Sequence, residues 1–171
     1  MYFTKIAFVL SLAVSALAMP TNGIYRKQKR ALTFRPYSEF QVSSGTAGNA
    51  LAEVQAQFPI NGTSLANVSD ADLAILKAAR ETAEAAETDA FNPAIDGNDS
   101  DALQNGKIKN KVLKLYLETM ALQIEQAQGA DNQAKIDAEQ KKLDTNVATD
   151  KKAAGQASQS VDFTGDVQPS Q

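Results

Sequence analysis

The stretch GKIKNKVLKLYLETMALQIEQAQ, residues 106–128, decides the fold of this 171-residue chain. At 3.6 residues per turn, its apolar side chains cover about 220° of a helix surface. They are Ile108, Val112, Leu113, Leu115, Tyr116, Leu117, Met120, Leu122, Ile124 and Ala127. Because so apolar a helix has to be covered on several sides, the pattern predicts a central helix capped at Gly129.

Two earlier stretches also carry apolar residues at helical spacing. Residues 46–58 place Leu51 and Val54 on one side, which predicts a first helix. Residues 70–90 have an alanine-rich stripe, an N-cap at Ser69 and a stop at Asn92-Pro93, which predict a second helix.

Residues 131–154 complete the predicted bundle. Their apolar stripe is narrow, and only a short break at Gly129 separates them from the central helix. The short break favours an αα-hairpin between these two helices. We therefore predict an all-α fold, a small bundle of about four helices over residues 46–154, in one domain.

The two flanks lack such patterns. Residues 31–45 are expected to form a loose, extended N-terminal segment, with some strand propensity but no evident partner strand. Residues 155–171 are rich in Gly, Ser and Gln and are expected to be a disordered tail. Phe163 in this tail is either an anchor on the bundle or a short recognition element, and the sequence favours neither.

Residues 1–18 have the features of a secretory signal peptide. Lys5 precedes a 13-residue apolar run over residues 6–18, and Ala16-Leu17-Ala18 fits the small-x-small pattern before signal peptidase cleavage. The run is shorter than the about 20 residues that span a bilayer, so no transmembrane anchor is expected.

Residues 19–30 are polar, basic and end in Lys29-Arg30. Such a pair soon after a signal peptide is similar to the cleavage site of kexin-type proteases of the fungal secretory pathway. We interpret residues 19–30 as a propeptide and Ala31 as the mature N-terminus. The alternative is a solvated basic linker.

Processing changes the charge of the chain. Residues 1–30 contain five of the 17 bases and none of the 20 acids, so the mature chain has 12 bases, 20 acids and a net charge of −8. A chain this acidic has no overall field that attracts nucleic acid. We expect a secreted, extracellular protein, which agrees with glycosylation sequons at Asn61, Asn67 and Asn98.

The amino-acid composition excludes several kinds of catalytic and metal-binding site. The chain has no His, Cys or Trp, which removes His-dependent triads, thiol nucleophiles and cysteine metal sites. The acidic loop at 96–101 resembles a calcium loop, but Asp101 replaces the essential Gly and Lys107 replaces the final Glu. We therefore expect no cofactor, no metal and no enzymatic activity.

A cluster of lysines begins the central helix. Lys107, Lys111 and Lys114 line up on it, and with Lys109 they are candidates for binding an anionic surface. The simpler interpretation, which we favour, is a solvated face on which Glu118 pairs with Lys114. The apolar surface of the central helix is likewise interpreted as core, although a marginal bundle could open at a lipid surface.

Four segments of the chain carry a family resemblance. TFRPYSEFQVSSG (33–45), LKAARETAEAAETDAFNPAI (76–95), LQNGKIKNKVLKL (103–115) and SVDFTGDVQP (160–169) resemble a group of cysteine-free small secreted proteins of filamentous ascomycetes. The resemblance implies a fungal source and a helical protein, and it implies no activity.

The functional hypothesis combines these observations. We expect a non-enzymatic secreted protein that acts at the cell surface or host interface, a candidate effector in virulence, whose partner is a host or cell-wall component. The alternative is an amphipathic helical protein that binds hydrophobic surfaces or lipids.

Overall fold

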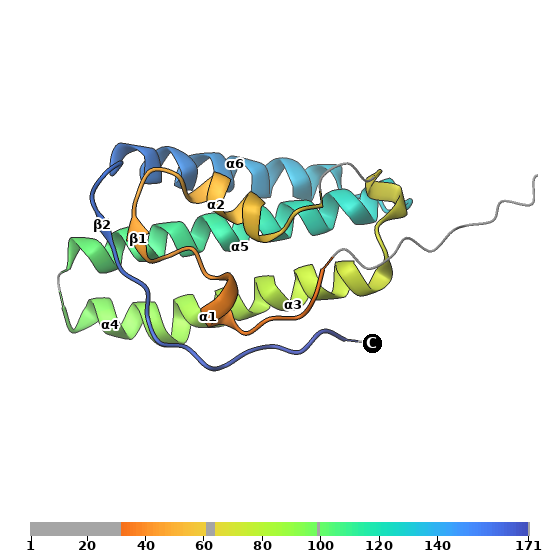
Figure 1. The fold of residues 1–171 in the computed structure, drawn as a ribbon. Coiled ribbons are helices and arrows are strands. Elements are labelled where there is room, and N and C mark those ends of the chain that lie inside the picture. The colour runs from red at the N-terminus through yellow and green to blue at the C-terminus, as the bar shows by residue number, and fades with distance from the viewer. Residues whose placement is uncertain (1–31, 61–63, 99, 171) are drawn as a thin grey trace, which may run out of the picture.

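The computed structural model describes residues 32–60, 64–98 and 100–170 and confirms an all-α bundle (Figure 1). Its helical elements are α1 (Tyr37–Phe40), α2 (Ala50–Gln57), η1 (Leu65–Asn67), α3 (Asp70–Ala86), η2 (Glu87–Phe91), α4 (Asn92–Asp96), α5 (Asp101–Ala127) and α6 (Gln133–Lys152). Two short strands, β1 (Gly45–Thr46) and β2 (Ala157–Ser158), pair antiparallel.

The central helix is α5, as predicted. It contacts α2, α3, α6 and β2, and its 27 residues extend about 40 Å at 1.5 Å per residue. Val112, Leu113, Leu117 and Ile124 are fully buried on it. The predicted αα-hairpin between α5 and α6 is also confirmed, and Gly129 takes the positive φ of +113° that the turn requires.

The start of α5 lies five residues before the predicted start at Gly106. Ser100 is the N-cap, and its hydroxyl accepts a hydrogen bond from the backbone N–H of Leu103. Gly106 is therefore inside the helix. A Cβ atom there would lie 1.9 Å from the carbonyl oxygen of Gln159, so the glycine allows the C-terminal tail to cross α5 closely.

The second predicted helix begins as expected but continues further. Ser69 caps α3 by accepting the N–H of Asp72 at 3.1 Å. The predicted stop at Asn92-Pro93 is wrong, because α3, η2 and α4 follow one another without a break from residue 70 to 96. In the π-helical turn η2, the N–H of Asn92 bonds to the carbonyl of Glu87, and this wider turn accommodates Pro93, which has no N–H to donate.

Residues 32–45 pack against the bundle instead of lying loose. Leu32, Tyr37, Phe40 and Val42 are buried in the core. The helix expected over residues 46–58 is shorter, because α2 begins at Ala50 after β1. The large hydrophobic side chains of residues 32–45 thus fill part of the core that the small side chains of the alanine-rich helices leave open.

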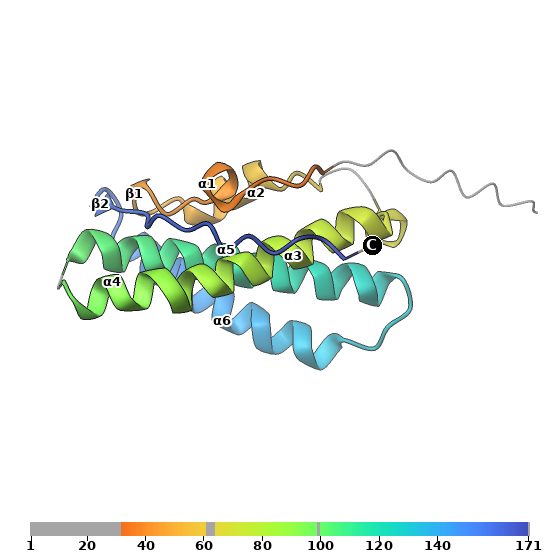
Figure 2. The ribbon, with the colours of Figure 1, turned by 90° about the horizontal axis from the view of Figure 1, so that it is seen from below.

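The prediction of a disordered tail at 155–171 is wrong for residues 155–170, which the structure describes and which begin with a hydrogen bond from the N–H of Gly155 to the carbonyl of Ala47. After β2, the tail runs along the same side of the bundle as α1 (Figure 2). The ring of Phe163 makes an edge-to-face contact with Tyr37 at 5.7 Å, so this residue is an anchor on the bundle. The N–H of Val167 donates to Thr82 Oγ1 of α3 at 2.9 Å.

The described parts of the chain contain no helix with both the length and the apolar character needed to cross a bilayer. The predicted signal peptide and propeptide, with Ala18, Lys29 and Arg30, lie outside the described residues.

Candidate functional site

The four lysines predicted as an anionic-surface site do not form one patch. Lys109 is fully buried, so its assignment to a binding surface is wrong. Its Nζ lies 2.8 Å from Glu53 Oε2 of α2 and donates to the carbonyl oxygens of Ser44 at 3.1 Å and Thr46 at 3.0 Å. The three N–H donors of the ammonium group thus hold α2 and β1 against α5.

Two other lysines are paired with carboxylates of the neighbouring helix. Lys114 Nζ lies 2.6 Å from Glu87 Oε2 and 3.3 Å from Glu84 Oε1, and Lys111 Nζ lies 3.4 Å from Glu87 Oε1. Glu118, expected to pair with Lys114, instead lies 2.7 Å from Arg80 Nε. The positive charges of Lys111 and Lys114 are therefore already paired with carboxylates of the same chain.

The fourth lysine, Lys107, is half-buried on α5. The structure therefore separates the predicted set into one buried lysine, two lysines paired with carboxylates and this half-buried one. Anionic-surface binding by the whole set gains no support from this arrangement.

The predicted glycosylation sites fall in different places. Asn67, in η1, and Asn98, after α4, are exposed, whereas Asn61 lies outside the described residues. Two sequon hydroxyls are also helix caps, since Ser69 caps α3 and Ser100 caps α5. Glycosylation of any of the three remains a prediction.

A polar network beneath α1 joins distant parts of the chain. The phenol of Tyr37 donates to Asn110 Oδ1 at 2.8 Å, and Asn110 Nδ2 donates to the carbonyl of Ala83 at 2.8 Å. The backbone N–H of Tyr37 donates to Asp166 Oδ1 of the tail at 2.6 Å. Burial raises the pKa of Tyr37 to about 12, so the phenol stays neutral at physiological pH.

A buried carboxylate orders the start of α2. Asp150, near the end of α6, accepts the N–H groups of Gly48 and Ala50 at 2.9 Å each. A carboxylate at this position is favourable because the first N–H groups of a helix lack partners within it. No pattern in the sequence indicates this contact, which joins residues about one hundred positions apart.

The candidate binding site is a groove beside Phe34, which we call the Phe34 groove. It lies between the N-terminal segment, the start of α3 and the end of the tail, and it has a volume of about 500 Å³. Its lining is mainly apolar, with Asp70, Gln168 and Ser170 as polar groups. The apolar lining residues are Phe34, Ala71, Ala74, Ile75 and Pro169.

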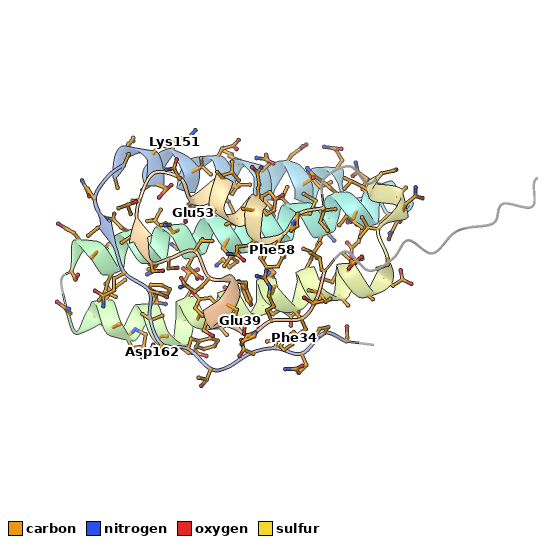
Figure 3. All side chains as sticks on the ribbon, in the orientation of Figure 1. Phe34, Glu39, Glu53, Phe58, Lys151 and Asp162 are labelled. Carbon is orange, nitrogen blue, oxygen red and sulfur yellow. The ribbon has the colours of Figure 1, made fainter. Side chains whose placement is uncertain are left out.

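Phe34 itself is unusual in this protein. Its side chain is 39% exposed, and within residues 32–60, 64–98 and 100–170 it is the one large hydrophobic side chain that is exposed to solvent. It lies beside the C-terminal tail (Figure 3). Sequence reasoning missed this site, because the groove needs the tail, which was expected to be disordered.

No group of three acidic side chains that could hold a metal ion occurs in the part of the chain that the structure describes. The chemistry of the Phe34 groove is that of a contact surface, with an aromatic ring, aliphatic side chains and one carboxylate. Such a surface binds apolar groups by removing them from water.

The chain belongs to the family described as "Domain of unknown function (DUF8454)", whose sequence model matches residues 32–162. The match covers all the helices and both strands of the described bundle. No curated protein and no solved structure matches the chain.

Proposed function

We propose that this protein is a secreted, non-enzymatic protein of a filamentous fungus that binds a protein partner at the cell surface or host interface through the Phe34 groove. The observation that carries the proposal is the exposed ring of Phe34 over an apolar groove. The partner is expected to insert an apolar side chain, in the manner of a hot-spot contact.

Two further features support this proposal. The groove volume of about 500 Å³ is within the range of sites that bind small ligands or single protruding side chains. The signal-peptide pattern, the dibasic pair and the sequons agree with export, which brings the groove into contact with extracellular partners.

The test compares two variants that add the same charge to the same segment. Phe34→Glu puts a carboxylate in the groove, whereas Ser38→Glu adds one on the exposed side of α1, outside the groove lining. We expect labelled Phe34→Glu protein to bind intact hyphae or host cells at least about tenfold more weakly than wild type, and Ser38→Glu to bind normally. Equal binding by all three proteins contradicts the proposal.

Lipid binding is the alternative function, and the same three proteins, wild type, Phe34→Glu and Ser38→Glu, can be used to test it. The apolar residues of α5 are buried in the core, so the bundle would have to open before they reach a membrane. Sedimentation with anionic liposomes at low salt tests this alternative directly. Co-sedimentation that is independent of Phe34 would favour it over the groove.

A further inference from the structure

The charges of the described residues are divided unequally between two parts of the bundle. Residues 32–60, 64–98 and 155–170 carry three bases and 11 acids, a net charge of −8. Residues 100–154, which contain α5 and α6, carry nine bases and eight acids, a net charge of +1. The lining of the Phe34 groove comes entirely from the first, strongly acidic part.

The three bases of the acidic part are already engaged with other groups of the protein. Arg35 donates to Gln57 Oε1 at 2.6 Å, and its guanidinium group lies over the ring of Phe58 at 5.6 Å. Lys77 Nζ and Arg80 Nε lie 2.5 Å and 2.7 Å from carboxylate oxygens of α5. Among the described residues that line the Phe34 groove there is no base.

Two carboxylates of α3 on the groove side differ from those that face α5. Asp70 lines the groove and is exposed, and Glu81 is exposed as well. Since residues 70, 74 and 81 are spaced by four and seven, Glu81 continues the line of Asp70 and Ala74 along the helix. The ion pairs found within the described ranges involve neither Asp70 nor Glu81.

The tail and α1 add further carboxylates beside the groove. The backbone N–H of Tyr37 donates to Asp166 Oδ1 at 2.6 Å, so Asp166 lies against α1, two residues before the groove residue Gln168. Glu39 of α1 and Asp162 of the tail are exposed, and both lie on the side of the molecule that carries Phe34 (Figure 3). The surroundings of the groove are therefore acidic.

We infer that the occupant of the Phe34 groove is a basic polypeptide segment, in which lysine or arginine residues flank the inserted apolar side chain. This inference rests on the proposed function, because it names the chemistry of the partner that the groove takes. The acidic surroundings attract a cationic partner over about 8 Å at physiological ionic strength. The exposed ring of Phe34 favours the same partner, since the face of an aromatic ring attracts Lys and Arg side chains.

The geometry favours a polypeptide over a small cation. Lys and Arg side chains cover apolar surface with their aliphatic stems while the charged ends stay in water, which fits an apolar groove with acidic surroundings. Asp70 and Glu81 are 11 residues apart, which is about 16 Å along α3. An extended chain of about five residues has this length. An anionic lipid or polysaccharide would be repelled by the same carboxylates.

The probe is a random peptide library displayed on phage, selected for binding to the purified protein and counter-selected against Phe34→Ser. Because this variant lacks the ring but keeps every carboxylate, the retained peptides depend on the groove and not on charge alone. We expect Lys and Arg within about three positions of an apolar residue to be enriched at least about threefold over the starting library, and Asp and Glu to be depleted.

Two double variants then test the position of the charges with one selected peptide. Asp70→Asn with Glu81→Gln removes two negative charges beside the groove, whereas Asp137→Asn with Asp144→Asn removes two exposed charges from α6. Both change the net charge equally, so a difference between them reports position. We expect the first to bind at least about fivefold more weakly than wild type and the second to bind within about twofold of it.

A salt titration of the wild-type protein keeps the inference testable if the Asp70 variant is less stable, since a carboxylate in the first turn also stabilises a helix. Raising NaCl from about 50 mM to about 500 mM should weaken peptide binding at least about tenfold. Peptides that need Phe34 but carry no excess of basic residues overturn this inference and leave the proposed function standing, as does equal binding by both double variants or binding independent of salt. A selection without any Phe34-dependent peptide contradicts the proposed function as well.

Discussion

Replacing Lys109 with methionine removes a buried ammonium group while keeping a side chain of similar length. The Nζ atom has three partners, Glu53 Oε2 and the carbonyl oxygens of Ser44 and Thr46. Breaking one hydrogen bond to a group that then lacks a partner costs about 1 kcal/mol or more. Because Glu53 is partly exposed and can be rehydrated, we count each partner at the lower limit and expect a total loss of about 3 kcal/mol.

The assay is urea unfolding followed by circular dichroism. At a slope of about 2 kcal/mol per M, the loss lowers the midpoint by about 1.5 M. The control is Lys142→Met, which removes an exposed i,i+3 pair with Glu139 and is expected to cost less than about 0.5 kcal/mol. Equal midpoints for Lys109→Met and Lys142→Met would refute the conclusion that Lys109 holds α2 and β1 against α5.

Three further changes test the core, the tail crossing and the polar network. Leu117→Asp places an unpaired charge at a fully buried position of α5 and should abolish cooperative melting, whereas a normal melt with full helical dichroism would contradict the bundle. Gly106→Ala should displace the tail at Gln159 and destabilise the protein by about 1–3 kcal/mol in urea unfolding, so an unchanged midpoint would argue against the close crossing. Tyr37 has a folded pKa of about 12 against an unfolded 10.0, so its stabilising contribution is complete below pH 10 and is lost as the pH rises toward 12. Tyr37→Phe should therefore have a smaller loss of stability between pH 10 and 12, and an identical pH profile would contradict the burial of this phenol.

The sequence predicted the parts of the fold that depend on periodicity. The broad apolar surface of residues 106–128 identified α5 as central, and the cap at Ser69 gave the start of α3. The end of that second helix was misplaced because Pro93 usually terminates a helix, whereas here a π turn absorbs its missing N–H.

The buried lysine was recognisable from the same helical wheel. Lys109 precedes Val112 and Leu113 by three and four residues, so it lies on the apolar face and not on the strip with Lys107. Grouping it with the other lysines by proximity in sequence concealed this difference. A lysine on an apolar face indicates a buried partner, although the sequence does not identify Glu53.

The position of the tail could not be inferred from composition. Besides the ring of Phe163 and the carboxylate of Asp166, the tail is held by backbone groups, such as the N–H of Gln159 bonded to the carbonyl of Ala102, and by a notch left by Gly106. Backbone hydrogen bonds leave little trace in residue type, so a Gly- and Ser-rich segment resembles a disordered one. The Phe34 groove was missed for the same reason, because the tail forms one of its walls.

Hydrogen exchange tests most directly whether residues 32–45 and 155–170 are held on a bundle built around a buried α5. We predict that the amides from Val112 to Ile124 exchange only through global unfolding, and that the N–H groups of Tyr37, Gln159 and Val167 are also protected by their partners. Exchange of the α5 amides at the rate of an unstructured peptide, or unprotected amides at all three end positions, would contradict the account.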